Sequence, residues 1–315
     1  MEKFPSREIN DKRSEIGSLT VRRYLPLEVS RKRFGLYLLL PSILLLFAFF
    51  IYPIIYSFYL STTNTNFFLL TIPLRFVGLQ NYIALFKNPD FLFSVRISFI
   101  FAIAATAIKL VIGFLLALLF QNKIKGFGVF RTLLVIPMMI TPICAGLIWK
   151  YMLQPGFGLI NYFLKFVGIT GLNWYTVPSS ALASVLMVDI WIMLPFVIVV
   201  FMSGLSSVPP DLYEAASIDG ATWRQNIFHI TIPTLKPIIV IVTLINFIDA
   251  FKVFDNIWIM TKGGPARATE IFTIFAYKQA LEQGYLGKGS AASIIILVII
   301  IIFTLIFINV SKAEY

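Results

Sequence analysis

The chain has 315 residues, of which 58% are hydrophobic and 13% charged, with a formal net charge of +11 and a mean hydropathy of +0.86. A soluble protein of this length could not bury so many apolar side chains, and these residues come in runs long enough to cross a bilayer. The composition therefore indicates an integral membrane protein. Nine of the 26 basic residues stand in residues 1–33, directly before the first apolar run, which indicates a cytoplasmic flank rather than a nucleic-acid-binding surface.

Six apolar stretches are long enough to be membrane-spanning helices, because only helices or closed barrels satisfy the backbone in lipid. The sequence predicts an all-α membrane protein with spans at Phe34–Phe58, Ile97–Phe120, Thr132–Trp149, Ser180–Gly204, Leu235–Ile259 and Ala291–Val310. Residues 1–33 are predicted to be a cytoplasmic basic tail, too long and too basic for a cleavable signal peptide. Residues 34–94 would form the first span and an extracytoplasmic loop, and residues 95–310 the main transmembrane domain. An even number of spans places both termini in the cytoplasm.

The loop between the fourth and fifth spans, residues 206–237, has the pattern of two short helices separated by a glycine. Ser207 can cap the first helix, the two prolines that follow fit its first turn, and Asp211 suits the positive end of the helix dipole. Gly220 then interrupts the helix, because it reaches backbone conformations that are closed to other residues.

The second short helix is predicted from an apolar stripe. Trp223, Ile227 and Ile230 recur at helical spacing, and we expect Pro233 to end this helix. A compact, partly apolar helical element that faces the cytoplasm needs a partner to cover it. The alternative is a loop that only packs on its own bundle.

This loop resembles the EAA motif of ABC importer permeases, which is Glu-Ala-Ala, three residues, Gly, nine residues, Ile, one residue, an aliphatic residue and Pro. The one departure is Ile232, where the family usually has Leu. The resemblance implies that the loop docks in a cleft on a cytoplasmic ATPase subunit. The docking residues that it implies are Glu214, Ala215, Ala216, Asp219, Gly220, Ile230 and Pro233.

Polar residues inside the spans are candidates for a substrate path, because ionisable groups are costly in a membrane. On a straight helix, four polar residues of the fifth span share one face: Asn246, Asp249, Lys252 and Asn256. Polar groups beside aromatic rings suit sugars, which combine hydroxyl groups with C–H faces. The candidates are Asp189, Trp191, Asn246, Asp249, Lys252, Asp255, Asn256 and Trp258. The alternative is internal pairing, for example between Asp249 and Lys252, that serves only helix association.

A second segment narrows the substrate class. Residues 254–265, which end in Gly-Gly-Pro, together with Thr269, Glu270 and Tyr277, resemble the signature of carbohydrate-type importer permeases, the group of the maltose and glycerol-phosphate systems. The resemblance implies a type I ABC importer permease fold in which the fourth and fifth spans line a sugar site. Lys109, in the second span, has no comparable support, and we expect it to be structural.

The resemblance also implies the partners. These are a second homologous permease, two ABC ATPase subunits and a solute-binding protein that delivers an oligosaccharide or related polyol to a bacterial or archaeal plasma membrane. The nearest look-alike of an ATP-binding loop, Gly284–Ser290, has the wrong spacing, so ATP and Mg would be bound by the ATPase subunits. We expect no catalytic residue, cofactor or metal site in this chain, since His229 is its only histidine and Cys144 its only cysteine.

Three alternatives to a sugar importer permease stay open. The first is an ABC permease for a non-sugar solute, against which the Gly-Gly-Pro segment counts. The second is an ion-coupled secondary transporter, whose signature would be internal repeats with paired broken helices. The third is an integral-membrane enzyme, which would need clustered histidines or carboxylates near one face of the membrane.

Overall fold

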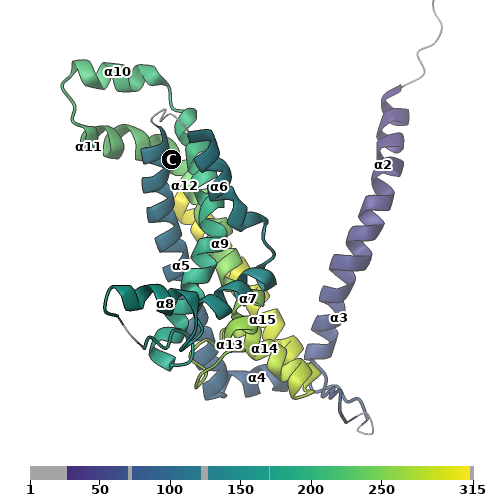
Figure 1. Cartoon of the computed structure of the whole chain (residues 1–315). Coiled ribbons are helices and arrows are strands. Elements are labelled where there is room, and N and C mark those ends of the chain that lie inside the picture. Colours follow the sequence, from purple (N-terminus) through teal and green to yellow (C-terminus); the bar gives the residue numbers. More distant parts are fainter. Residues whose placement is uncertain (1–26, 70–72, 122–126, 170, 313–315) are drawn as a thin grey trace, which may run out of the picture. The chain divides into compact units, whose positions relative to one another are not determined.

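The computed structural model describes residues 27–69, 73–121, 127–169 and 171–312, and it divides into two compact units, Met1–Tyr56 and Ser57–Tyr315 (Figure 1). The first unit contains α2 (Leu27–Leu46), a π-helical turn η1 (Phe47–Ile51) and the start of α3 (Tyr52–Ser61). Most of the predicted basic tail, residues 1–26, lies outside the described residues. The helix at its end begins at Leu27, ahead of the predicted start of the first span.

The second unit is a bundle of helices. In chain order these are α4 (Gln80–Phe86), α5 (Pro89–Gln121), α6 (Phe127–Met139), α7 (Pro142–Met152), α8 (Leu159–Phe166), α9 (Pro178–Ser206), α10 (Pro210–Ile218), α11 (Trp223–Asn226), η2 (Ile227–Thr231), α12 (Ile232–Phe251), α13 (Asp255–Thr261), α14 (Phe272–Tyr277), η3 (Lys278–Glu282) and α15 (Leu286–Lys312). The described part of the chain has five helices long and apolar enough to span a membrane, or six if one bent pair is a single span. The prediction of an all-α membrane protein is confirmed.

The third predicted span, Thr132–Trp149, is not one straight helix. It consists of the segments Thr132–Met139 and Pro142–Met152, which meet at an angle of 104°. The break has a local cause. Pro142 disfavours a helical conformation at Thr141, whose φ of −62° and ψ of 141° are extended.

The fifth predicted span, Leu235–Ile259, differs at both ends. The prediction that Pro233 ends a helix is wrong, because the π-helical turn η2 carries the helix from α11 into α12 without interruption. A π turn widens the backbone where proline would otherwise clash and leave a carbonyl unpaired. The helix instead breaks at residues 252–254, where Phe254 has a φ of −141° and a ψ of −54°.

The core of the bundle forms where α5, α9 and α12 pack together. Close approach of α5 and α9 depends on Gly113, where a Cβ atom would come within 2.6 Å of a methyl group of Val197. Aromatic rings fill the space between the helices: half-buried Phe99 meets buried Phe251 edge to face at 5.0 Å, and half-buried Phe114 meets buried Phe201 in the same way at 5.6 Å. Close packing of this kind holds the polar residues of α9 and α12 in fixed positions.

Candidate functional site: an exposed helical element and a cavity in the bundle

Two helices, α10 and α11, project from one end of the second unit, away from the end formed by α4 and α14 (Figure 1). We call residues 209–233 the helical element. The prediction that Ser207 caps α10 is wrong, because its hydroxyl donates a hydrogen bond of 2.7 Å to the Gly204 carbonyl at the end of α9. Pro209 occupies the capping position instead, and Pro210 begins the helix. Asp211 lies in the first turn, as predicted.

The turn between α10 and α11 is built around Gly220, as the sequence predicts. Gly220 has a φ of +74°, its N–H donates to the Ser217 carbonyl, and the Ala221 N–H donates to the Ala216 carbonyl at 2.9 Å. This pair of hydrogen bonds is the Schellman motif, which needs a left-handed residue at the glycine position. The turn therefore has one defined geometry, which sets the angle between the two helices.

The sequence contains a second cap, which the prediction missed. The Gln225 N–H donates to the Thr222 hydroxyl, and the Thr222 N–H donates to the Gln225 side-chain oxygen at 2.7 Å. The spacing Thr-x-x-Gln is the known signature of such a capping box, so this signal was present in the sequence. It fixes the start of α11 immediately after the glycine turn.

The helical element exposes most of the residues that the EAA resemblance marks. Exposed residues are Glu214, Ala215, Asp219, Gly220 and Pro233, and half-buried residues are Ala216 and Ile230. The predicted apolar stripe is only partly exposed: Trp223 is exposed, Ile230 is half-buried and Ile227 is buried. The exposed apolar side chains are instead Leu212, Ile218 (86% exposed), Trp223 and Phe228. Such a group of exposed apolar side chains on a small protruding element is typical of a docking surface.

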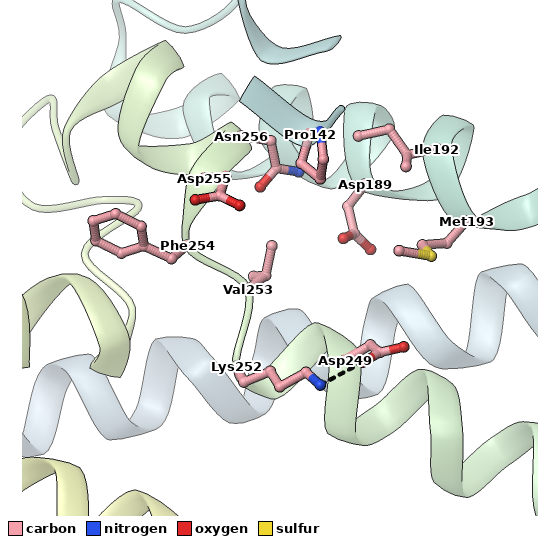
Figure 2. A pocket seen from close by; sticks show the side chains of 10 residues that line it. All are labelled: Pro142, Asp189, Ile192, Met193, Asp249, Lys252, Val253, Phe254, Asp255 and Asn256. Carbon is pink, nitrogen blue, oxygen red and sulfur yellow. Dashed lines mark ion pairs between the residues drawn. The ribbon is translucent and has the colours of Figure 1, made fainter. Parts of the chain in front are cut away.

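The second feature is a cavity between α7, α9 and the ends of α12 and α13, with a volume of about 200 Å³ (Figure 2). It is lined by Pro142, Asp189, Ile192, Met193, Asp249, Lys252, Val253, Phe254, Asp255 and Asn256. Five of the predicted path residues are among them: Asp189, Asp249, Lys252, Asp255 and Asn256. The prediction that the polar residues of the fifth span share one helix face is wrong for Asn256, because it lies on α13 beyond the helix break.

Two of the carboxylates that line this cavity form ion pairs with lysines. The Lys109 ammonium group lies 3.0 Å from an oxygen of Asp189, and both side chains are buried. Lys252 pairs with Asp249 at 2.9 Å on the more exposed side, as the internal-pairing alternative anticipated. Lys109, which we expected to be only structural, is thus paired with a residue that lines the cavity. Its position inside an apolar run was the available signal, since ionisable residues there are rarely without a partner.

The remaining predicted path residues do not line the cavity. Trp191 packs edge to face on Trp149 at 5.5 Å, and Asn246 is buried and donates to the Val242 carbonyl of its own helix. Trp258 stacks on Phe254 at 5.5 Å and meets Tyr277 at 4.6 Å. Missed lining residues are Pro142, Ile192, Met193 and Val253. For Ile192 and Met193 the signal was their spacing of three and four residues from Asp189.

The Gly-Gly-Pro segment forms a closed loop after α13. Glu270 is buried and binds both Arg267 and Lys278 at 2.7 Å, and Arg267 also pairs with Asp90 at the start of α5. Burial alone would lower the pKa of Arg267, but its hydrogen bonds and ion pairs with Glu270 and Asp90 raise that pKa above its ordinary value. The loop therefore joins α13 and α14 to α5 and closes one end of the bundle.

These features define an integral membrane transport protein, with a polar cavity inside a helical bundle and an exposed helical element at one end. A family model described as "Binding-protein-dependent transport system inner membrane component" matches residues 109–313. The chain belongs to this family, a family of multi-pass transporter permeases, and the resemblance drawn from its two motifs is confirmed.

The chain is similar to named permeases over almost its whole length. It is 32% identical to the trehalose/maltose transport system permease protein MalF of Thermococcus litoralis, over 91% of this chain and 96% of that protein. It is also 32% identical to the sn-glycerol-3-phosphate transport system permease protein UgpA of Agrobacterium fabrum, over 85% of this chain and 90% of that protein. The fold matches a chain of a bacterial ABC transporter that imports alginate, with a TM-score of 0.79, 22% identity and coverage of 91% and 97%.

Proposed function

We propose that this chain is a permease subunit of a type I ABC importer and forms half of the path for a sugar or related polyol. One observation carries the proposal. The helical element continues through η2 into α12, and α12 ends at the cavity with Asp249 and Lys252. A movement of the element would therefore reach the cavity through one uninterrupted helix. ATP-driven closure of two ATPase subunits would switch the cavity between inward and outward access.

The partners follow from the same arrangement. The ATPase subunits would hold ATP and Mg and would dock on the helical element through Glu214, Ala215, Ala216, Asp219, Gly220, Ile230 and Pro233. Exposed Ile218 and Trp223 add apolar contact area to this surface. A second, homologous permease would complete the cavity, and an extracytoplasmic solute-binding protein would deliver the solute. The basic tail supports a plasma-membrane location with the N-terminus in the cytoplasm, and a count of six spans, with the bent pair taken as one, would place the C-terminus there too.

The substrate class rests on two supports. Relatives that share about a third of their residues with this chain are named for trehalose/maltose and for sn-glycerol-3-phosphate. The cavity combines carboxylates and an amide with Phe254 and Met193, which suits the hydroxyl groups and C–H faces of a polyol. No hydrolytic role is proposed for this subunit, since the ATPase subunits would supply the energy.

Co-purification tests the docking surface. The tagged chain is purified from its native membrane as wild type, as Glu214→Ala, as Ile218→Ser and as the control Glu282→Ala, which changes an exposed carboxylate in η3 at the other end of the unit. We expect an ATPase and a second permease with the wild type and the control, and a loss of the ATPase alone from the other two variants. A wild-type chain that purifies alone, or docking variants that keep their ATPase, would contradict the proposal.

A further inference from the structure

The short helix α8 has an exposed apolar face. Its exposed residues of this kind are Leu159, Tyr162, Phe163 and Phe166, the last with 72% of its surface exposed. At about 100° per residue, these four side chains fall within one arc of about 100° around the helix. On the other sides, Ile160 packs against the core of the bundle and Asn161 is buried. The helix therefore turns one apolar side toward the bundle and a second one away from it.

The orientation of α8 is fixed by the side chain of Asn161. Its amide nitrogen donates to the carbonyl of Leu172 at 3.1 Å and to that of Gln154 at 3.4 Å. Its amide oxygen accepts a hydrogen bond of 2.8 Å from the indole N–H of Trp174. All the hydrogen-bonding atoms of this side chain are thus used to hold the helix, as expected for a buried amide. The aromatic face consequently points outward in one defined direction.

The contacts of Trp174 give the level at which α8 lies. The Ser184 hydroxyl donates to the Trp174 carbonyl at 2.7 Å, which ties the loop after α8 to the first turns of α9. These turns lie at the end of α9 opposite Ser206, after which the helical element begins. With 29 residues, α9 is about 43 Å long, whereas the hydrocarbon layer is about 30 Å thick. The first turns of α9, and α8 beside them, therefore reach the boundary between lipid and water. In Figure 1, α8 lies crosswise to α5 and α9.

The residue types of this region suit lipid better than a protein partner. Among the four exposed residues of the apolar face, only Tyr162 carries a polar group, whereas a protein interface needs about one hydrogen bond per 100–200 Å². Aromatic residues are typical of the membrane interface. The sequence contains no Asp or Glu between Lys150 and Asp189, and the exposed Lys165 lies about 160° around the helix from Phe163. A cation in that position suits the phosphate groups of lipids.

We propose that α8 is an interfacial membrane anchor. Its apolar face inserts at the boundary between headgroups and acyl chains, in the leaflet opposite the helical element, and Lys165 points to the lipid phosphates. This inference goes beyond the importer function and does not depend on it. Because α8 contacts α7, which begins at the cavity residue Pro142, the anchor would hold one wall of the cavity at a constant depth in the membrane.

Nitroxide labels on α8 measure this depth. Cys144, the only cysteine, is first replaced by Ser, and a label is then attached in the variant Phe163→Cys or Lys165→Cys. The chain, with the partners that co-purify, is placed in lipid nanodiscs without a solute-binding protein. Relaxation of the label by oxygen, which concentrates in hydrocarbon, is compared with relaxation by a water-soluble nickel chelate. We expect the oxygen-to-nickel ratio to be at least about fivefold higher at position 163 than at position 165.

A second position on the apolar face guards against a local effect of one substitution. The label in Phe166→Cys should give the high ratio found at position 163. Equal ratios at positions 163 and 165, or free access of the nickel chelate to positions 163 and 166, would overturn the inference because the face would then lie in water. A label that neither reagent reaches would also overturn it, since the face would then be covered by a protein partner such as the second permease. None of these results alters whether an ATPase co-purifies with the chain, so failure of this inference and failure of the importer assignment are separate results.

Discussion

Lys109 and Asp189 are 80 positions apart in the chain, yet the ammonium group of one lies 3.0 Å from the carboxylate of the other. The pair joins α5 to α9 at the edge of the cavity, and both residues are buried. Charges in such a position are costly to separate, because removal of one partner leaves the other charge without compensation. This contact therefore links the stability of the bundle to the shape of the cavity.

Replacement of one member of this pair should destabilise the protein strongly. We expect Lys109→Met to lower the free energy of unfolding by about 3–5 kcal/mol, because Asp189 is left buried and unpaired. Thermal unfolding of the detergent-purified chain, followed by intrinsic tryptophan fluorescence, measures the change. Lys109→Met combined with Asp189→Leu should recover most of the lost stability while it abolishes solute binding. A double variant no more stable than the single one would contradict the pairing.

The backbone conformation of Gly220, rather than the space around it, should determine which substitutions keep the importer active. A Cβ atom at this position meets nothing within 4 Å, but the φ of +74° is strained for residues with side chains. Asn tolerates this conformation better than a β-branched residue. We therefore expect Gly220→Asn to keep most of the solute-stimulated ATPase activity of the reconstituted importer and Gly220→Val to lose at least about tenfold. Equal activity of the two variants would show that the conformation is not required.

The ion pairs of Glu270 should hold one end of the bundle together. Glu270→Gln removes the charge that binds Arg267 and Lys278, both at 2.7 Å, and it leaves two cations facing a neutral amide. We expect a loss of about 2–4 kcal/mol of stability, because Glu270 is buried. Limited proteolysis at the α13–α14 loop measures the opening. The variant Asp90→Asn, which affects only the partly exposed partner of Arg267, should be cut at nearly the wild-type rate.

The α5–α9 contact should tolerate no branched side chain at Gly113. A Cβ atom there would already lie 2.6 Å from Val197, so Gly113→Val forces the two helices apart. We expect a poorly folded protein, seen as a low monodisperse yield in size-exclusion chromatography. Gly113→Val combined with Val197→Gly returns similar volume to the contact and should restore part of the yield. An unchanged yield of the single variant would mean that the helices do not meet at this position.

The sequence predicted the spans well because their signal is local. A run of apolar residues determines its own helix, and the signal from Gly220 is equally local because it depends on one backbone angle. The bend before Pro142 could also have been predicted from the sequence, because a proline disfavours a helical conformation at the preceding residue, here Thr141. The break at residues 252–254 could not be predicted in this way, because no proline or glycine stands there; beyond it, α13 packs against α7.

The candidate site was predicted less completely for the same reason. Asp189 and Asp249 were predicted because charged residues in apolar runs are rare. The same rule, applied to Lys109, would have identified it as the partner of a charged residue. That Lys109 faces Asp189 depends on how α5 and α9 pack, which no short pattern records. Pro233 was misinterpreted because a π-helical turn accommodates a residue that usually stops a helix.

The break at residues 252–254 separates two walls of the cavity. Asp249 stands on the long helix that begins at the exposed element, whereas Asn256 stands on α13, which packs against α7. A tilt of α12 would therefore move Asp249 relative to Asn256, and residues 252–254 would act as the hinge between the two helices. Because this hinge lines the cavity, its angle would set the width of the cavity. A solute that contacts both walls would therefore directly oppose or favour the movement of α12.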